Sequence, residues 1–469
     1  MKTFQLFLLA CCCFAFGMNH HASAQQVAGG SAVRTMTLEE CLKIAAGDNP
    51  EVQIGVAQVQ DAEGRVKSAF APFLPTLSIN GGYSRTLNDT TLNVFPRASK
   101  EDSNKVELAF QPFYTPEVFR NGFNANISAN YTIFNGFQRE NTYSQTQSNF
   151  QSSQSSLSHT KRRIWWTVRS QYIAVMRSKQ VLKVRQEDFQ VGKKQLERIK
   201  AQYEAGVIAV ATVYTQEADV ANRELAIVQA ENDLELAKGA LLTTLGMNPG
   251  EPADFVDIAQ QTTTESDIRA FRAEIGDFNK AYGTAYGKRL DLAAAKASIE
   301  AANAGVNVAQ AAYFPTVNAT AGYNWNSPLV GNFQYGSQSL GINFRYNIFD
   351  GLDRDARTQI ARASVIQSEV QKRQSEQRVA SDVQNAFIQL NTSEKNLDIT
   401  ARGLKAAQQN FDAAEERFKV GAANILDLTT ANGNLATAKI NRINALYNYI
   451  AAQYQMKFAL GILDEGEVK

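Results

Sequence analysis

Apolar residues recur at every seventh position in two long stretches of this chain. The later series comprises Val383, Leu390, Leu397, Leu404, Phe411 and Phe418, and a small residue stands three positions after each of the first five. The earlier series comprises Val168, Val175, Leu182, Phe189, Leu196 and Tyr203. An apolar repeat of seven residues, sustained over this length, predicts a left-handed coiled coil. Because the two series match position for position, we interpret the chain as two copies of one unit.

Each copy is predicted to hold three helices. In the first repeat, residues 37–246, a capping box at Thr37 begins a helix, because Glu40 stands three residues later. The prolines after Ala71 end this helix, since proline lacks an amide donor. The second repeat spans residues 284–461 and also begins with a helix. The other predicted helices are long ones over 137–203 and 352–418 and return helices over 207–245 and 424–460.

Segments of alternating polarity follow the first helix of each copy. Leu77, Ile79 and Tyr83, for example, alternate with serine, threonine and asparagine. This pattern is typical of a strand with one apolar and one polar face. The four predicted strands cover residues 76–87, 122–134, 316–326 and 337–349. Residues 88–120 contain three prolines and are predicted to be a long polar loop.

The lengths of these elements indicate a membrane protein with a long extension. A helix of about 67 residues is on the order of 100 Å long, more than a globular domain needs. Strands of about 10 to 13 residues can cross a bilayer when tilted, with their apolar face against lipid. Four strands are too few to close a barrel, and open sheet edges are not tolerated in lipid, so we expect an oligomer. Polar residues expected in the barrel lumen are Arg85, Asn126, Asn318 and Arg345.

Aromatic residues cluster where strands are predicted to meet helices. Two interpretations are compatible: a girdle at the membrane interface, or packing at a helix–strand junction. The residues are Phe70, Phe73, Phe134, Phe137, Tyr313, Phe314 and Phe349.

The N-terminal segment, residues 1–24, has the layout of a cleavable secretory signal. An apolar run over 4–16 is followed by Ala22-Ser23-Ala24, and we expect cleavage before Gln25. A lipoprotein signal ending at Cys11 is the alternative. In the rest of the chain we predict a linker over 25–36, an equatorial insert that forms a short capping subdomain over 247–283, and a tail over 462–469.

Composition excludes several classes of function. The 47 basic and 46 acidic residues balance, so no nucleic-acid partner is indicated. No phosphate-binding glycine loop, zinc-ligand cluster or nucleophile elbow occurs, so we predict no enzyme, no cofactor and no metal site. His159, the only histidine after the signal segment, is expected to be solvated. Cys41, the only cysteine there, is expected to be a buried free thiol.

The sequence resembles the TolC family of outer-membrane efflux and secretion channels. The resemblance covers about residues 36–463 and is most specific from Phe418-Lys419-Val420-Gly421 through Ile425-Leu426-Asp427-Leu428 to Ala459-Leu460-Gly461. It implies a mixed α+β membrane protein, a homotrimer in which four strands per chain complete a twelve-stranded barrel in outer-membrane lipid. A long periplasmic helical barrel would continue it. The implied function is the passive exit duct of a tripartite efflux pump or type I secretion system.

The resemblance also implies roles for the helical hairpin turns. The turns would lie at the periplasmic tip and dock an adaptor protein, which connects to an inner-membrane pump of the RND or ABC type. The turn residues here are Ala205, Gly206 and Val207 in the first copy, and Val420, Gly421 and Ala422 in the second.

Asp427 matches an acidic residue of the family near the tunnel mouth. Two interpretations stay open, and both can hold: three copies form a carboxylate ring that attracts cations, or the side chain caps the helix beginning near Ile425.

The tunnel mouth departs from the family pattern. Family members close it with an acid, a tyrosine and an arginine, whereas this sequence has Thr212, Phe418 and Ala423. The charged latch is therefore absent, and we expect a weakly held tip. The sequence does not indicate whether drugs, metal ions or polypeptides pass. The alternative function is a trimeric coiled-coil fibre or adhesin anchored in the outer membrane.

Overall fold

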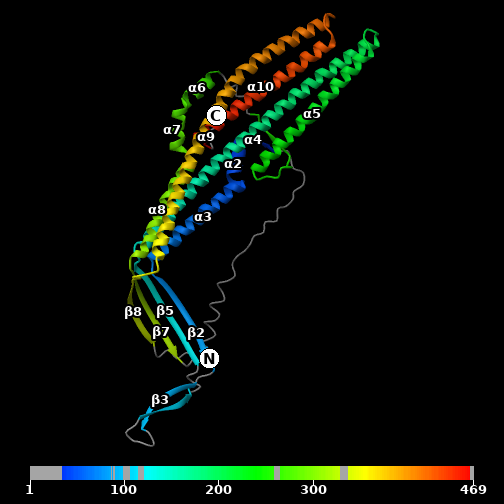
Figure 1. Cartoon of the computed structure of the whole chain (residues 1–469). Helices are drawn as coiled ribbons and strands as arrows, with labels where there is room; N and C mark the ends of the chain where they lie inside the picture. Colours follow the sequence, from blue (N-terminus) through cyan, green and yellow to red (C-terminus); the bar gives the residue numbers. More distant parts are fainter. Residues whose placement is uncertain are drawn as a thin grey trace.

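The protein is an elongated rod with helices at one end and a β-sheet at the other (Figure 1). The computed structural model describes residues 34–85, 87, 90–98, 106–114, 121–257, 265–327 and 336–464. The predicted signal segment, the alternative lipidation site at Cys11, residues 25–33 of the predicted linker and residues 465–469 of the predicted tail lie outside these residues.

Two long antiparallel helical hairpins form the rod. The long helices α4 (Gln138–Glu204) and α9 (Asp353–Lys419) have 67 residues each, as the sequence predicts. The return helices α5 (Val210–Thr244) and α10 (Ile425–Ala459) have 35 residues each. Along the layer the order is α5, α4, α10, α9, so α5 and α9 are the edge helices. Repeat residues such as Val383 are fully buried, which confirms the coiled-coil packing.

The first helix of each copy is broken, which corrects the prediction of a single helix from Thr37 to Ala71. The chain forms α2 (Leu38–Asp48) and α3 (Pro50–Phe70), and the predicted capping box at Thr37 is confirmed. Pro50 biases the preceding residue, Asn49, to extended backbone, which interrupts the helix. The Asn49 side-chain oxygen then accepts hydrogen bonds from the backbone amides of Glu51 and Val52. Its Nδ2 donates to the Thr244 carbonyl at 2.7 Å.

The second copy contains the same break, at Arg289. It separates α7 (Phe278–Lys288) from α8 (Leu290–Gln310). The helix α7 crosses the predicted boundary between the insert 247–283 and the second repeat, so that boundary does not coincide with the end of an element. The weak periodicity of this short helix explains the difference.

The four predicted strands pair in one antiparallel sheet of order β2-β5-β7-β8. The strands are β2 (Thr76–Arg85), β5 (Asn121–Phe134), β7 (Thr316–Ser327) and β8 (Gly336–Arg345). The strand β8 ends four residues before the predicted position 349. Arg345, the last residue of β8, pairs with Thr316, the first residue of β7. Pro315 precedes Thr316 and has no amide hydrogen to donate, so the hydrogen-bonded ladder ends here.

The predicted polar loop over 88–120 contains a β-hairpin, which is a second correction. The strands β3 (Thr90–Ala98) and β4 (Val106–Tyr114) pair with each other and with no other described strand. Pro96 and Pro112 lie within this ribbon. Each strand of a two-stranded ribbon has a free edge, so a proline there removes no ladder bond if its nitrogen faces outward. The hairpin extends beyond the main sheet (Figure 1).

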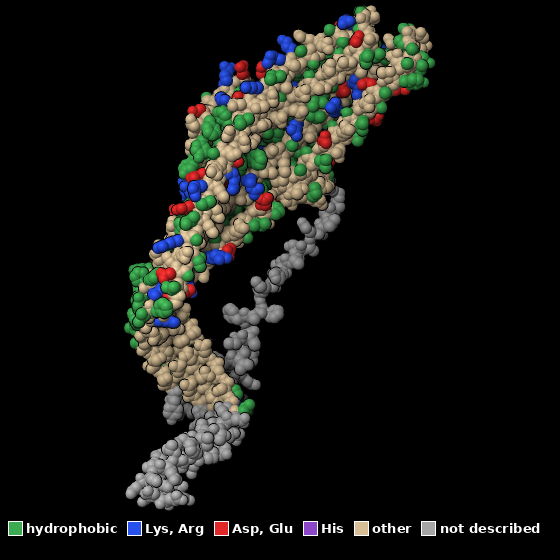
Figure 2. Space-filling view, viewed as in Figure 1, with side chains coloured by type: hydrophobic (Ala, Val, Ile, Leu, Met, Phe, Trp, Pro, Cys, Tyr) green, Lys and Arg blue, Asp and Glu red, His purple; other side chains and the backbone are tan. Residues whose placement is uncertain are grey.

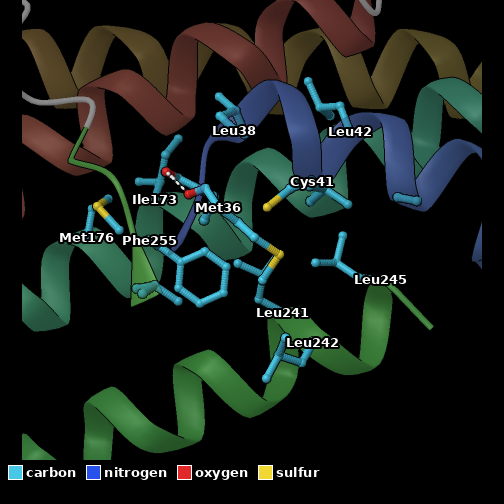
Figure 3. Packing of buried hydrophobic residues seen from close by; sticks show 14 of the residues in the cluster. Met36, Leu38, Cys41, Leu42, Ile173, Met176, Leu241, Leu242, Leu245 and Phe255 are labelled. Atoms are coloured by element: carbon cyan, nitrogen blue, oxygen red, sulfur yellow. Dashed lines mark hydrogen bonds between the residues drawn. The ribbon is translucent and has the colours of Figure 1, made fainter. Parts of the chain in front are cut away.

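A compact hydrophobic core joins α2, α4 and α5 (Figure 3). The strand β1 (Arg34–Met36) pairs in parallel with β6 (Ala253–Phe255), so the end of the predicted linker is a strand held by the insert. The insert also contributes α6 (Glu265–Ile275). The Tyr172 hydroxyl donates to the carbonyl groups of Met36 and Val256 and fixes this small sheet on α4. The free thiol of Cys41 is buried here as predicted, and burial raises its pKa to about 12.

The junction aromatics pack against one another, as one of the two interpretations predicts, and some of them are exposed. Phe70 stacks on Phe73 at 5.5 Å, and Phe134 contacts Phe137 edge to face at 5.4 Å, both between ring centroids. Phe349, in contrast, leaves most of its surface exposed. The junction is therefore packed internally and still presents aromatic surface outward.

Candidate functional site

The β-sheet has one polar and one apolar face, and the pairing register assigns every residue to one of them. On the polar face only glycine, serine, threonine, asparagine and one arginine occur among the described strand residues. Figure 2 views this face, and it is almost free of both hydrophobic and charged side chains. Besides glycines, the residues of the polar face are Thr76, Ser78, Asn80, Ser84, Asn124, Asn126, Ser128, Asn130, Thr132, Thr316, Asn318, Thr320, Asn324, Asn326, Ser337, Ser339, Asn343 and Arg345.

The opposite face is apolar and uncovered in the single chain. Leu77 is 73% exposed and Leu340 is 88% exposed. Aromatic pairs lie toward the end of this face distant from the helices, where the ring centroids of Tyr83 and Phe123 are 4.8 Å apart. Exposed aliphatic residues with an aromatic border are typical of a lipid-facing barrel surface.

Three of the four residues predicted for the barrel lumen lie on the polar face. The Asn126 amide donates to the Asn324 side chain of the adjacent strand. Asn318 lies opposite Asn343, and Arg345 pairs with Thr316 in the last row. Arg85 is the exception, which corrects its assignment.

The register places Arg85 with Leu77, Ile79 and Tyr83, because side chains alternate along a strand without a bulge. The sequence interpretation grouped Arg85 with the polar residues by its charge and not by its parity. Position 85 is odd, like the three apolar residues, so its side chain starts from the apolar face.

The two hairpin turns lie together at the end of the rod opposite the sheet (Figure 1). Gly206 and Gly421 both have left-handed backbone, with φ of 72° and 74°, which favours glycine at a helix C-terminus. Val207 is 71% exposed and Val420 is 77% exposed. The flanking turn residues Ala205 and Ala422 are also exposed. Each turn therefore presents one exposed valine on a rigid glycine turn.

Residues predicted for the tunnel mouth lie one turn behind this tip. Thr212, Phe418 and Ala423 are half-buried, whereas Asp427 is exposed. The Asp427 carboxylate accepts from the Asn424 amide at 3.4 Å, and the Asn424 side chain accepts from the Asp427 amide at 2.9 Å. This capping box shows that Asp427 does cap α10, and its exposure leaves the carboxylate accessible.

A buried polar cluster behind the tip was not predicted from the sequence. Arg223 of α5 forms ion pairs with Asp188 of α4 and, at 2.7 Å, with Asp219 of α5. Asn432 of α10 donates to the same Asp188 carboxylate at 2.8 Å. The cluster therefore connects the two helical hairpins within one chain.

Burial sets the electrostatics of this cluster. Burial raises the pKa of Asp188, and the Arg223 guanidinium partly opposes that shift. A sequence signal exists: Gln216 and Arg223 lie three positions after Val213 and Val220, at the second seam position of the seven-residue repeat. Polar residues at such positions are typical of specificity determinants in coiled coils.

His159 differs from its prediction as a solvated residue. It is half-buried, with its ring centroid 6.0 Å from that of Phe458, and burial lowers its pKa. In the part of the chain that the structure describes, no three metal-ligating side chains come together and no helix has the length and apolarity to cross a membrane.

A family model for outer membrane efflux proteins matches residues 41–247 and 281–462, well over half of the chain. The chain belongs to this family. It is an outer-membrane efflux duct of the TolC type with a periplasmic helical extension, and not an enzyme. Membership decides against the fibre or adhesin alternative.

Some relatives of this efflux duct match it over nearly their full length. The outer membrane protein TolC of Vibrio cholerae is 25% identical over 447 residues, which cover 93% of each chain. Among solved structures, the CmeC channel of Campylobacter jejuni superimposes with a TM-score of 0.74 at 15% identity, covering 92% of this chain and 87% of CmeC. The CusC channel superimposes with a TM-score of 0.72 at 18% identity, covering 90% of this chain and 92% of CusC. These structures confirm the duplicated fold.

Proposed function

We propose that three copies of this chain form a twelve-stranded barrel that serves as the passive exit duct of a tripartite efflux or secretion assembly. The observation that carries this proposal is the sheet itself. Its edge strands β2 and β8 have no described partner on their outer sides, and its apolar face is exposed. Open edges are not tolerated in lipid, so β8 of one copy must pair with β2 of the next.

The helical edges support the same assembly. Exposed apolar residues occur on the edge helices at intervals of eleven, close to three helical turns, and thus form a stripe along each helix. They are Tyr214, Leu225 and Leu236 on α5, and Ile388 and Ile399 on α9. In a ring of three copies, α9 of one copy would cover α5 of the next.

The tip is proposed to dock a periplasmic adaptor. Val207 and Val420 would provide the apolar contacts, and the four neighbouring residues Ala205, Gly206, Gly421 and Ala422 would allow close approach of the partner backbone. An inner-membrane pump of the RND or ABC type would supply the energy. Thr212, Phe418 and Ala423 would line the tunnel mouth without a charged latch.

The proposal is tested by native mass and conductance of the protein extracted from outer membranes in detergent. We expect a trimer that opens stable ion channels in planar bilayers, because only a closed barrel with a hydrated lumen conducts. Intact mass also decides the anchor, since cleavage before Gln25 and acylation at Cys11 give different masses. A detergent-free monomer without channel activity would refute the proposal.

Replacement of Asp427 by asparagine is expected to make the trimeric channel less cation-selective. Three carboxylates at the tip would attract cations, and asparagine keeps a capping oxygen while removing the charge. The measurement is the reversal potential in a KCl gradient. Asp412→Asn, on the exposed surface of α9, is the matched control. Equal reversal potentials for wild type and Asp427→Asn would mean that Asp427 acts only as a cap.

A further inference from the structure

Arg345 is the single charged residue on the polar face of the described four-stranded sheet. It is the last residue of β8 and lies opposite Thr316, at the sheet end nearest the helices. The remaining polar-face residues carry only hydroxyl groups, amides or no side chain. The charge is therefore isolated along the whole polar face.

A cavity of about 490 Å³ opens beside Arg345 at this junction. Its polar lining residues include Asn135, Gln138, Asn347 and Arg357. None of the lining residues is acidic. Arg357 is paired with Asp353, so the positive charge at this cavity comes from Arg345. Side-chain amides together with a guanidinium group form the combination that recognises carboxylate or phosphate groups.

The acidic residues of the described junction are already paired. Asp350 binds Arg354 at 3.0 Å, and Asp353 binds Arg357 at 2.7 Å. Asp355 accepts from the Tyr313 hydroxyl. Arg345 itself makes no ion pair with a described residue.

The neighbouring copy supplies no acid on the facing strand. In the trimer, β8 would abut β2 of the next copy. The polar-face residues of β2 are Thr76, Ser78, Asn80, Gly82 and Ser84, none of them acidic. The guanidinium group therefore stays available to the lumen.

We propose that Arg345 forms a basic collar of three guanidinium groups at the base of the barrel, which attracts anionic groups of the cargo into the duct. This inference rests on the proposed trimer. The chemical class that the collar and its cavity recognise is a carboxylate or phosphate carried on a small molecule or peptide. The collar has the opposite charge to the Asp427 ring at the tip, so the duct would be electrostatically asymmetric.

The test compares Arg345→Glu with wild type in planar bilayers. We expect the chloride-to-potassium permeability ratio to fall by about twofold or more, since a change of only about 0.7 kT in the local potential alters the local ion concentration twofold, and protein surface potentials reach several kT. The effect should be larger in 0.1 M than in 1 M KCl, because the screening length falls from about 10 Å to about 3 Å. Inorganic tripolyphosphate added on the barrel side should reduce wild-type current and have less effect on Arg345→Glu.

Arg85→Gln is the matched control, because it removes an arginine from the opposite face of the same sheet. Its permeability ratio should equal that of wild type. Channels whose ratio and tripolyphosphate response are unchanged by Arg345→Glu would overturn the collar while leaving the duct intact. Absence of any channel in wild-type protein would instead refute the proposed trimeric duct, and the collar with it.

Discussion

Replacement of Arg223 by methionine is expected to lower the free energy of unfolding by about 3–5 kcal/mol, because it leaves a buried carboxylate without its partner. Methionine retains the length of the side chain, so packing against Gly192 is disturbed little; a Cβ built on Gly192 would already lie 2.8 Å from Arg223 Cδ. The measurement is denaturant unfolding followed by circular dichroism at 222 nm, a wavelength that reports helix content.

A half-exposed ion pair provides the control for Arg223. Lys200 binds Glu217 at 2.8 Å between the same two helices, and their side chains are 48% and 43% exposed, against 7% and 10% for Arg223 and Asp188. Lys200→Met should therefore cost at most about 1 kcal/mol. Equal losses for Arg223→Met and Lys200→Met would contradict the importance of burial.

The loss in free energy of unfolding caused by Arg223→Met should also depend on pH. Burial already raises the pKa of Asp188, and removal of Arg223 would raise it further. In the Arg223→Met variant, Asp188 then binds its proton more tightly in the folded than in the unfolded protein. The variant therefore keeps its stability below the pKa of Asp188 in the unfolded chain, about 4, and loses stability as the pH rises toward the higher pKa of Asp188 in the folded chain. The deficit should be smaller at about pH 4 than at pH 7, and a deficit that grows on acidification would contradict this account.

Periodic patterns predicted most of the fold because burial imposes them directly. The seven-residue repeat around Val383 and Leu390 predicts the long helices, and alternation in Leu77 and Ile79 predicts the sheet. In each case one face of the element is packed or meets lipid, so the sequence must carry its period. The duplication strengthened the prediction, since each element had a counterpart.

Features without periodicity were predicted less well. The break at Asn49 depends on one Asn-Pro step within a helical pattern, and the hairpin over β3 and β4 contains Pro96, which is usually a strand breaker. Arg85 was assigned by residue type although its position in the pleat decides its face. The polar seam position of Arg223 is a local signal, but its partners Asp188 and Asn432 lie on two other helices, and no local pattern identifies them.

Gly136→Ala is expected to destabilise the folded chain by about 2–5 kcal/mol, whereas Gly351→Ala, its equivalent in the second copy, should impair trimer assembly. Both glycines have left-handed backbone, φ 68° and 70°, which costs alanine about 1–2 kcal/mol. A Cβ at Gly136 would also lie 2.5 Å from the Ala311 carbonyl oxygen, which adds about 1–3 kcal/mol of overpacking.

The space beside Gly351 is open in the single chain, with no atom within 4 Å of a built Cβ. The duplication accounts for the difference. Gly136 packs on the segment ending at Phe314 of the same chain. The equivalent segment ends at Leu74, and in the proposed trimer Gly351 would pack on this segment of the next copy. Gly351→Ala should therefore keep the helix content of wild type but lower the trimer fraction in native mass measurements, whereas Gly136→Ala lowers the unfolding midpoint. Identical behaviour of the two variants would argue against a ring in which the two copies of the repeat alternate around one axis.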